Sequence, residues 1–389
     1  MFSLLRPLTS VSVSVRLFST SSRVLGRAVV YAQNGDPAKV LSVLTYPPLP
    51  TPPPNSVNIK FLLSPINPAD VNVIEGVYPT KPTKTDALTA YGKGGEEQPV
   101  FVGGNEGVAR VSAVGEGVKD LKEGDWVVMI KQQAGTWATD RNVSVVDVAK
   151  VPDAHLLNEA QAATITVNPP TAYNMLNDFI GLKPGDWVIQ NGANSAVGQA
   201  VIQIAAAQGL KTINLIRDRP NLEELKKKLE SLGATQVLTY DQLADKSVRE
   251  KVKEWTGGKP IRLGLNCVGG PETTAMARLL GNGAHLVSYG GMAKQPLAIP
   301  TSLFIFKNLT CHGFWQSRWY SQKPLEEREK LMQALVDLMK ENKLDSPAHE
   351  IVEVSAQDPD EVATKKVQGL FQAISEGRYG KKVLLKINE

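Results

Sequence analysis

The stretch Trp187-Val-Ile-Gln-Asn-Gly-Ala-Asn-Ser-Ala-Val-Gly-Gln199 decides the fold class of this 389-residue chain. Its apolar start, Trp187–Ile189, predicts a strand, and Val197, Val201 and Ala205 recur four apart, as on one face of a helix. A glycine turn between strand and helix lets backbone N–H groups approach a pyrophosphate, and the helix N-terminus adds partial positive charge. The usual three-glycine spacing places a glycine near position 194 or 195, where this chain has asparagine and serine. Alone, the stretch fits either a dinucleotide site or a purely structural strand–turn–helix.

The chain beyond residue 160 decides between these two interpretations, because helical patterns alternate there with short β-rich runs. These runs are Thr212–Ile216, Gln236–Thr239, Leu263–Cys267, His285–Tyr289 and Leu309–Phe314. Helices are expected at Ser247–Trp255 and from Pro324 onward, where Leu331, Leu335, Leu338 and Met339 mark an apolar face. Such alternation predicts an α/β fold with a doubly wound parallel sheet, which favours the dinucleotide site.

The first part of the chain has the short strands and glycine turns of a β-barrel. We expect strands at Ala28–Tyr31, Val40–Thr45 and Val57–Leu63, a helical turn at Pro68–Ile74 and a mobile loop at Thr80–Gly95. After residue 344 a strand at Glu350–Val354, a helix near Glu361–Glu376 and a strand at Lys382–Ile387 predict a return to the first domain. The expected domains are therefore residues 26–158, 159–344 and the returning segment 345–389.

Residues 1–25 are expected to be a mitochondrial presequence. They contain Arg6, Arg16 and Arg23 among many serines and threonines, and the first acidic residue is Asp36. A disordered tail is the alternative. Without these arginines the remainder is nearly neutral, so charge gives no argument for nucleic-acid binding. No run of about 20 apolar residues predicts a membrane span.

The order of a β-barrel, a Rossmann domain and a C-terminal return resembles the medium-chain dehydrogenase/reductase superfamily. The motifs that carry this resemblance are Ile66-Asn-Pro-Ala-Asp70, Gly103-Gly-Asn-Glu-Gly-Val-Ala109 and Lys183-Pro-Gly-Asp-Trp-Val188. The resemblance implies a GroES-like catalytic domain, a Rossmann cofactor domain and a homodimer formed through the cofactor domain.

Within that superfamily the chain is similar to the mitochondrial trans-2-enoyl-thioester (enoyl-[acyl-carrier-protein]) reductases. Shared motifs are Asn194-Ser-Ala-Val-Gly-Gln199, Val167-Asn-Pro-Pro-Thr-Ala-Tyr173, Tyr289-Gly-Gly-Met292, Gly313-Phe-Trp-Gln316 and Gly76-Val-Tyr-Pro79. The resemblance implies NADPH-dependent reduction of trans-2-enoyl thioesters in the mitochondrial matrix, with acyl carrier protein or CoA as the carrier. Acyl carrier protein is thus an expected partner, and nucleic acid is not.

Zinc is not expected. Zinc-dependent alcohol dehydrogenases of the superfamily have Gly-His-Glu where this chain has Gly104-Asn105-Glu106. Cys267 and Cys311 are the only cysteines, too few for a four-cysteine structural site. The four histidines have no metal-binding spacing, and Cys311 and His312 are adjacent on an expected strand, so they point to opposite faces. We therefore predict no metal site.

Tyr78 is the expected catalytic residue, by resemblance to the family's tyrosine. Hydride addition to C3 of an enoyl thioester builds charge on the thioester oxygen, and C2 must then receive a proton. A phenol carries its proton at neutral pH and can donate it. The alternatives are that Tyr78 only orients the thioester, or that it is a loop tyrosine packed on the barrel.

The cofactor is expected to be NADPH, because Arg217-Asp218-Arg219 follows the second Rossmann strand. NAD enzymes usually place an acidic residue there, whereas a 2′-phosphate is matched by arginine. An exposed charged loop in which Asp218 pairs with an arginine is the alternative.

The resemblance implies further cofactor residues at the glycine turn, at the ends of later strands and near the C-terminus. They are Asn168, Asn194, Ser195, Ala196, Val197, Tyr289, Gly290, Gly291, Met292, Phe314, Trp315, Gln316 and Lys381. An ordinary β-to-α turn at Tyr289–Met292 and interdomain core at Phe314–Trp315 are the plain alternatives. Lys382 stands beside Lys381, so the register of the lysine is open.

Two other functions compete with the enoyl reductase. A zeta-crystallin-like NADPH quinone oxidoreductase shares the fold, the cofactor and the lack of zinc. A catalytically silent, nucleotide-sensing or nucleic-acid-binding regulator is the rival from another class. Tyr78 and the expected presequence favour the enoyl reductase.

Overall fold

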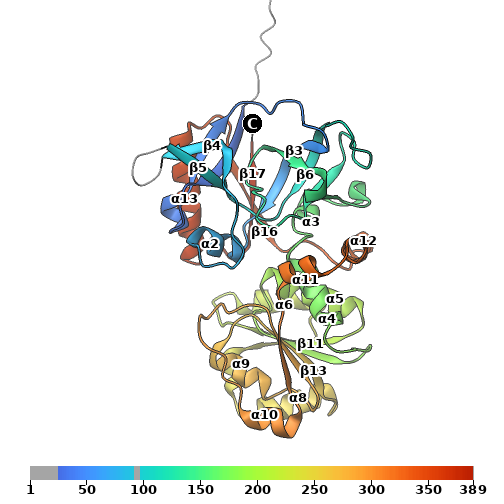
Figure 1. Cartoon of the computed structure of the whole chain (residues 1–389). Coiled ribbons are helices and arrows are strands. Elements are labelled where there is room, and N and C mark those ends of the chain that lie inside the picture. Colours follow the sequence, from blue (N-terminus) through green and yellow to red (C-terminus); the bar gives the residue numbers. More distant parts are fainter. Residues whose placement is uncertain (1–24, 92–96, 389) are drawn as a thin grey trace, which may run out of the picture.

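The structure is a computed structural model that describes residues 25–91 and 97–388. The expected presequence lies outside the described residues, apart from Leu25. Figure 1 shows two parts: one combines the beginning and the end of the chain, and the other is built from its middle.

The stretch that begins at Trp187 forms β10 (Trp187–Gln190), a turn and α5 (Ala196–Ala207). Every residue of β10 is buried, as expected for a strand covered on both faces. Ser195 is the N-cap of α5, and its Oγ accepts from the Gly198 N–H at 3.1 Å. Serine can stand where the usual pattern has glycine, because the backbone at Ser195 is extended, with φ −69°, a conformation that any residue adopts.

Gly198 is the glycine that packing requires. A Cβ added there would lie 2.6 Å from the Ala193 carbonyl oxygen, so a larger residue would push α5 away from the turn. Gly192 adopts φ +62°, in the left-handed region that glycine favours. The unusual fingerprint thus keeps glycine at the two places where the backbone needs it.

The middle part of the chain contains the predicted doubly wound parallel sheet, with strand order β12-β11-β10-β13-β14-β15. The α/β fold class is confirmed. The strand order reverses at β10, and ligands bind at such switch points, at the carboxyl ends of the strands. Its other elements are α3 (Glu159–Ala163), α4 (Asn168–Asn177), β11 (Lys211–Ile216), α6 (Leu222–Ser231), β12 (Gln236–Thr239), α7 (Tyr240–Ala244), α8 (Val248–Thr256), β13 (Ile261–Asn266), α9 (Gly270–Ala277), β14 (His285–Ser288), α10 (Thr301–Lys307), β15 (Thr310–Gly313), α11 (Gln316–Gln322) and α12 (Leu325–Lys340).

The other part is mainly antiparallel and contains two sheets, with orders β2-β1-β5-β4 and β16-β17-β3-β6-β7-β9; β8 also pairs with β3. Its elements are β1 (Gly26–Tyr31), α1 (Pro37–Val40), β2 (Ser42–Tyr46), β3 (Ser56–Pro65), α2 (Pro68–Glu75), β4 (Thr85–Tyr91), β5 (Glu97–Val102), β6 (Val108–Val114), β7 (Trp126–Met129), β8 (Asp140–Ser144), η1 (Val145–Asp147), β9 (Val148–Lys150), η2 (Ala154–Leu156), β16 (His349–Val354), α13 (Asp360–Ser375) and β17 (Lys382–Ile387).

The last segment returns to the first part, as predicted. β16 and β17 pair in parallel, and β17 joins β3 with Leu384 opposite Pro65. In Figure 1 the red α13 and β17 accordingly lie among the blue elements. This return brings the start of β17 to the start of α2.

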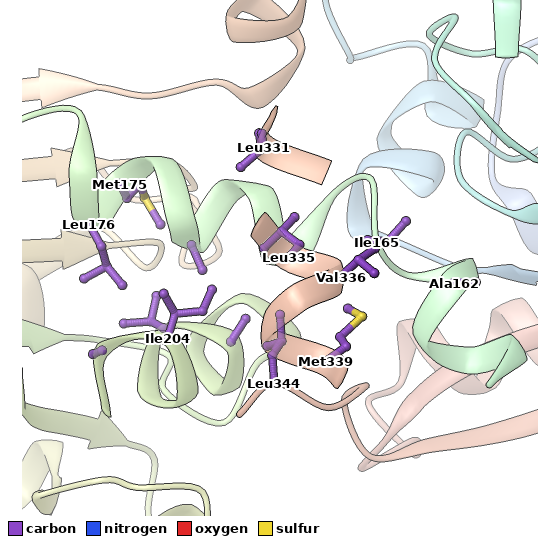
Figure 2. Packing of buried hydrophobic residues seen from close by; sticks show 14 of the residues in the cluster. Ala162, Ile165, Met175, Leu176, Ile204, Leu331, Leu335, Val336, Met339 and Leu344 are labelled. Carbon is purple, nitrogen blue, oxygen red and sulfur yellow. The ribbon is translucent and has the colours of Figure 1, made fainter. Parts of the chain in front are cut away.

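Helix α12 seals the junction between the two parts. Leu331, Leu335 and Met339 are buried on one face, in a cluster that includes Met175 of α4 and Ile204 of α5. Figure 2 shows these side chains meeting between the helices. Burying such side chains stabilises the fold by about 1.5–3 kcal/mol each. The junction is therefore a packed core.

One local expectation is wrong, and the strand expected at Val40–Thr45 begins at Ser42 instead. The loop predicted at Thr80–Gly95 contains β4, which pairs with β5 through Thr85 opposite Val100; residues 92–96 lie outside the described residues. Val40 ends a short helix that begins after Asp36, whose side chain accepts from the Ala38 N–H. In both places tertiary pairing or a local cap overrides propensity. None of the described helices combines the length and apolarity needed to cross a membrane.

Candidate functional site

The turn after β10 has the form expected of a pyrophosphate-binding turn, a strand end followed by a helix N-terminus. The first N–H groups of α5, from Ala196 and Val197, precede any possible intrahelical acceptor. The Asn194 carbonyl accepts from Gln199 Nε2 at 2.8 Å, which holds the turn against the helix. The turn residues predicted for the cofactor are thus assembled at the switch point of the sheet.

Arg217, Asp218 and Arg219 follow the end of β11. Arg217 and Asp218 are exposed, and within the described residues Asp218 forms no ion pair with either arginine. Asp218 Oδ1 instead accepts from the Arg219 backbone N–H at 2.9 Å. Arg219 Nε is buried without a hydrogen-bond partner. Since a buried guanidinium nitrogen is normally paired, Arg219 fits an absent anionic ligand such as a 2′-phosphate.

A cavity of about 160 Å³ lies where the barrel part meets α5 and the ends of β14 and β15. It gathers predicted site residues from distant parts of the chain: Tyr78, Val197, Tyr289, Phe314, Trp315 and Gln316. Positions after β14 and β15 lie at the carboxyl edge of the parallel sheet, where ligands bind in this fold. Asn67, Asp70, Asn105, Thr166 and Thr171 complete much of the remaining wall.

The Tyr78 hydroxyl has a defined partner. Trp315 Nε1 donates to the Tyr78 oxygen at 2.9 Å, and the two rings meet edge to face with centroids 6.0 Å apart. An indole N–H can only donate, so this bond leaves the Tyr78 hydroxyl hydrogen free. The Arg318 guanidinium lies over the Trp315 ring at 5.8 Å from its centroid, which restricts the indole.

Three residues that line the cavity each carry a buried polar atom without a hydrogen-bond partner of good geometry: Asp70 Oδ1, the Tyr289 hydroxyl oxygen and Gln316 Nε2. Gln316 Oε1 is fixed by Asn174 Nδ2 at 3.1 Å, so its Nε2 is held facing away from that bond. Buried polar groups without partners are rare in folded proteins. Their presence here marks the cavity as a ligand site.

A buried charged cluster stands behind the cavity. Asp70 and Glu106 are 2% and 1% exposed, and Lys382 Nζ donates to Asn67 Oδ1. Asn67 Nδ2 donates to Glu106 Oε2 at 2.9 Å, and Glu106 Oε1 accepts from the Val167 N–H at 2.8 Å. Glu106 thereby links the barrel part to the residue before α4.

Burial sets the protonation of this cluster. It raises the pKa of Asp70 from 3.8 to about 7, against the opposing effect of the Asn67 N–H, and raises the pKa of Glu106. Burial also lowers the pKa of Lys382, and the two carboxylates oppose that shift. With two carboxyl groups and one ammonium group, the cluster is neutral when it holds one additional proton.

The other residues predicted to bind the cofactor differ in their surroundings. Asn168 is buried and its Nδ2 donates to Asn67 Oδ1 at 3.3 Å. Gly290, Gly291 and Met292 are exposed after β14. Lys381 is exposed, and its charge acts on Lys228 of α6, whereas Lys382 enters the buried cluster. The two adjacent lysines therefore have different surroundings, which the sequence left open.

Where zinc dehydrogenases have a histidine ligand, Asn105 Oδ1 accepts from the Gln133 N–H at 2.7 Å. His285 and His312 stack on each other, with Nδ1 and Nε2 3.0 Å apart. No group of three or more His, Cys, Asp or Glu side chains in the described part of the chain is arranged to hold a metal ion. The described residues offer hydrogen-bond donors to the cavity instead.

A larger cavity of about 860 Å³ continues from the small one, since Asn105, Gln132, Thr166 and Tyr320 line both. Its walls are formed by barrel loops and α12, with apolar contributions that include Met129, Ile130, Val148, Ile165, Leu331 and Leu335. The Tyr320 hydroxyl donates to the Thr166 carbonyl at 3.0 Å, at the junction of the two cavities. A long apolar group has room here.

Sequence reasoning did not assign Asp70, Glu106 and Lys382 to the site. Asp70 and Glu106 belong to the family motifs Ile66–Asp70 and Gly103–Ala109, and these motifs could have indicated a functional role for both residues. Charged residues are usually exposed, however, and only the fold shows that these are buried together.

Comparison with known proteins gives the family. A family described as "Alcohol dehydrogenase GroES-like domain" matches residues 53–153, and one described as "Zinc-binding dehydrogenase" matches residues 196–337. The mitochondrial enoyl-[acyl-carrier-protein] reductase of Yarrowia lipolytica is 43% identical over 93% of this chain and 92% of its own length. The human protein of that name is 46% identical over 83% of this chain and 81% of its own length.

Solved structures agree. The Etr1p/NADP/crotonyl-CoA complex has a TM-score of 0.85 and 38% identity, covering 93% of this chain and 100% of the other. A putative NADPH:quinone reductase from Bacillus thuringiensis, at 22% identity over 93% of this chain and 99% of the other, and a TM-score of 0.75, shows the fold alone. The chain belongs to the mitochondrial enoyl-[acyl-carrier-protein] reductase family, within the medium-chain dehydrogenase/reductase superfamily.

Proposed function

We propose that this protein is a mitochondrial enzyme that reduces the C2=C3 bond of trans-2-enoyl thioesters with NADPH. The observation that carries the proposal is the Tyr78–Trp315 hydrogen bond in a cavity bounded by the nucleotide turn, because it leaves a phenolic hydrogen free beside the cofactor site. The family membership and the ligands named for the Etr1p complex support the same reaction.

Bound NADPH supplies the hydride that reduces C3. The π electrons move to the thioester oxygen, and C2 then takes a proton, so that the thioester gains two electrons and two hydrogens. Tyr78 donates that proton in this proposal. Trp315 N–H stabilises the phenolate left behind, until solvent protonates it again.

Arg217 and Arg219 are proposed to bind the 2′-phosphate of NADPH. The turn before α5 is proposed to bind its pyrophosphate. The unpartnered Arg219 Nε supports this assignment.

The acyl chain is proposed to extend from Tyr78 into the larger apolar cavity, past Thr166 and Tyr320. Ile130→Trp, at the wall of the larger cavity, should then reduce turnover of decenoyl thioester much more than that of crotonyl thioester.

Acyl carrier protein is the proposed carrier. The lining of the larger cavity has three basic residues, Lys119, Lys150 and Arg328, against two acidic ones, Asp120 and Glu329, and this excess suits an acidic protein. A homodimer is the proposed assembly. β15 is the edge strand of the six-stranded sheet, and the neighbouring α10 exposes Phe304, Ile305 and Phe306.

A substrate comparison tests the proposed function. NADPH oxidation is measured with crotonyl, hexenoyl and decenoyl thioesters and with benzoquinone, at equal concentrations. The enoyl thioesters should be reduced with kcat/KM at least about a hundredfold higher than the quinone. Faster quinone reduction would instead support the zeta-crystallin-like activity, and inactivity towards both would favour a silent regulator.

A further inference from the structure

Asp70 lines the same cavity as Tyr78, and the proposed mechanism gives it no role. Its Oδ2 accepts from the Asn67 N–H at 2.7 Å, while Oδ1 is buried and unpartnered on the cavity wall. Capping the first turn of α2 needs only one carboxylate oxygen. The second oxygen is therefore available to a ligand.

The surrounding charges determine which carboxyl group holds the additional proton. Glu106 accepts from Asn67 Nδ2 at 2.9 Å, the Thr166 N–H at 3.0 Å and the Val167 N–H at 2.8 Å. Asp70 accepts from the Asn67 N–H and has a smaller contribution from the Asn105 backbone, so fewer donors stabilise its ionised form. Since hydrogen bonds from donors favour the ionised form, Glu106 is the stabilised anion opposite Lys382.

The elements packed around Asp70 provide no further cation. Tyr31 of β1 faces it, Glu106 approaches from the loop before β6, and Lys382 comes from β17. Tyr320 of α11 faces Glu106. Lys382 is shared with Glu106 and bonded to Asn67, so Asp70 holds its proton below about pH 7.

Resting on the proposed function, we propose that Asp70 is a second catalytic residue, whose protonated Oδ1 donates a hydrogen bond to the thioester oxygen of the substrate. A buried carboxylic acid can serve as such a donor, because it needs no reorganisation as charge develops on the oxygen. Asp70 keeps its proton throughout. The proton that forms the C2–H bond still comes from Tyr78, and the electrons still come from NADPH.

Asp70→Asn separates a hydrogen-bond donor from an ionisable group. The asparagine carbonyl can accept from the Asn67 N–H as Oδ2 does, and its NH2 group is a donor at every pH. Asp70→Ala removes both functions. Asp178→Asn is the matched control, because burial also raises the pKa of Asp178, whose Oδ2 accepts from Trp319 Nε1 at 2.9 Å.

The measurement is kcat/KM for crotonyl thioester with NADPH between pH 5.5 and 9. The wild-type protein and Asp178→Asn should lose activity about tenfold per pH unit once Asp70 ionises, above about pH 7. Asp70→Asn should stay within about tenfold of wild type at pH 6 and show no such decline. Asp70→Ala should be about a hundredfold slower at pH 6.

The infrared carbonyl band of 13C-labelled thioester bound with NADP+ gives a second readout. It should shift to lower wavenumber at pH 6 in wild type and Asp70→Asn, lose that shift at pH 9 in wild type only, and lack it in Asp70→Ala. If Asp70→Ala fails to fold, the wild-type and Asp70→Asn spectra still decide.

Parallel pH profiles in wild type and Asp70→Asn would overturn the inference, as would a carbonyl band that does not respond to Asp70. An absence of crotonyl reduction in wild type at every pH would instead overturn the proposed function. The two failures are therefore distinguishable.

Discussion

A single hydrogen bond determines how the hydroxyl group of Tyr78 is oriented. Trp315 Nε1 donates to its oxygen, so the hydroxyl hydrogen is available to a substrate in the cavity. Tyr78→Phe should lower kcat with crotonyl thioester at least tenfold and leave the dissociation constant of NADPH unchanged. Stopped-flow turnover and fluorescence titration measure these two quantities. Tyr379→Phe, which alters a tyrosine packed in another cluster, should behave like wild type, and near-normal turnover of Tyr78→Phe would remove Tyr78 from the mechanism.

Asp70 also controls stability. Its pKa is raised by burial from 3.8 to about 7, so the folded state binds a proton that the unfolded state releases between these values. Stability from this group is therefore present at low pH and is lost as pH rises from about 4 to 7, by up to roughly 4 kcal/mol. Asp70→Asn should remove this loss and raise the Tm relative to wild type at pH 8. Denaturation scans at pH 5 and pH 8 test it, and an equal Tm difference at both pH values would contradict it.

At the scale of the element, the end of β11 is the proposed determinant of the preference for NADPH. β11 pairs in parallel with β10 and brings Arg217 and Arg219 to the carboxyl edge of the sheet, where a bound nucleotide's ribose lies in this fold. The double variant Arg217→Ala, Arg219→Ala should raise KM for NADPH at least about tenfold and hardly affect KM for NADH. Lys226→Ala on α6, which breaks an exposed pair with Glu223, is the control. Equal loss with both cofactors would count against a 2′-phosphate site.

At the scale of the whole molecule, α10 exposes a group of large apolar side chains, Phe304, Ile305 and Phe306, to solvent. Phe306 is 79% exposed beside the edge strand β15, and the proposed homodimer would bury it. Phe306→Asp should shift the protein towards monomers, because burying a carboxylate in an apolar interface is costly. Sedimentation velocity measures the change. Val362→Asp, at an exposed apolar position on α13, should keep the wild-type state, and a monomeric wild type would contradict the proposal.

The fold was predictable because its signals are local. The runs that form β11 to β15 were predictable from their β-rich composition between helical patterns, and the turn at Gly192–Gly198 from its residue types. β4 was missed, because its pairing with β5 joins residues whose own sequence indicates a loop. Much of the cavity was predictable by resemblance, including Tyr78 and Trp315, although their hydrogen bond was not.

Short-range sequence patterns were enough to predict the βα alternation and the helix N-terminus at the nucleotide turn. They also showed the two arginines after β11 and the asparagine, Asn105, in place of a zinc-ligand histidine. Each depends on residue type and spacing over a short distance. The folded structure was needed to show that Asp70, Glu106 and Lys382 share one buried cluster and that Lys381 lies outside it. Those residues come from opposite ends of the chain, and their protonation follows from burial and mutual distance, which no local pattern encodes.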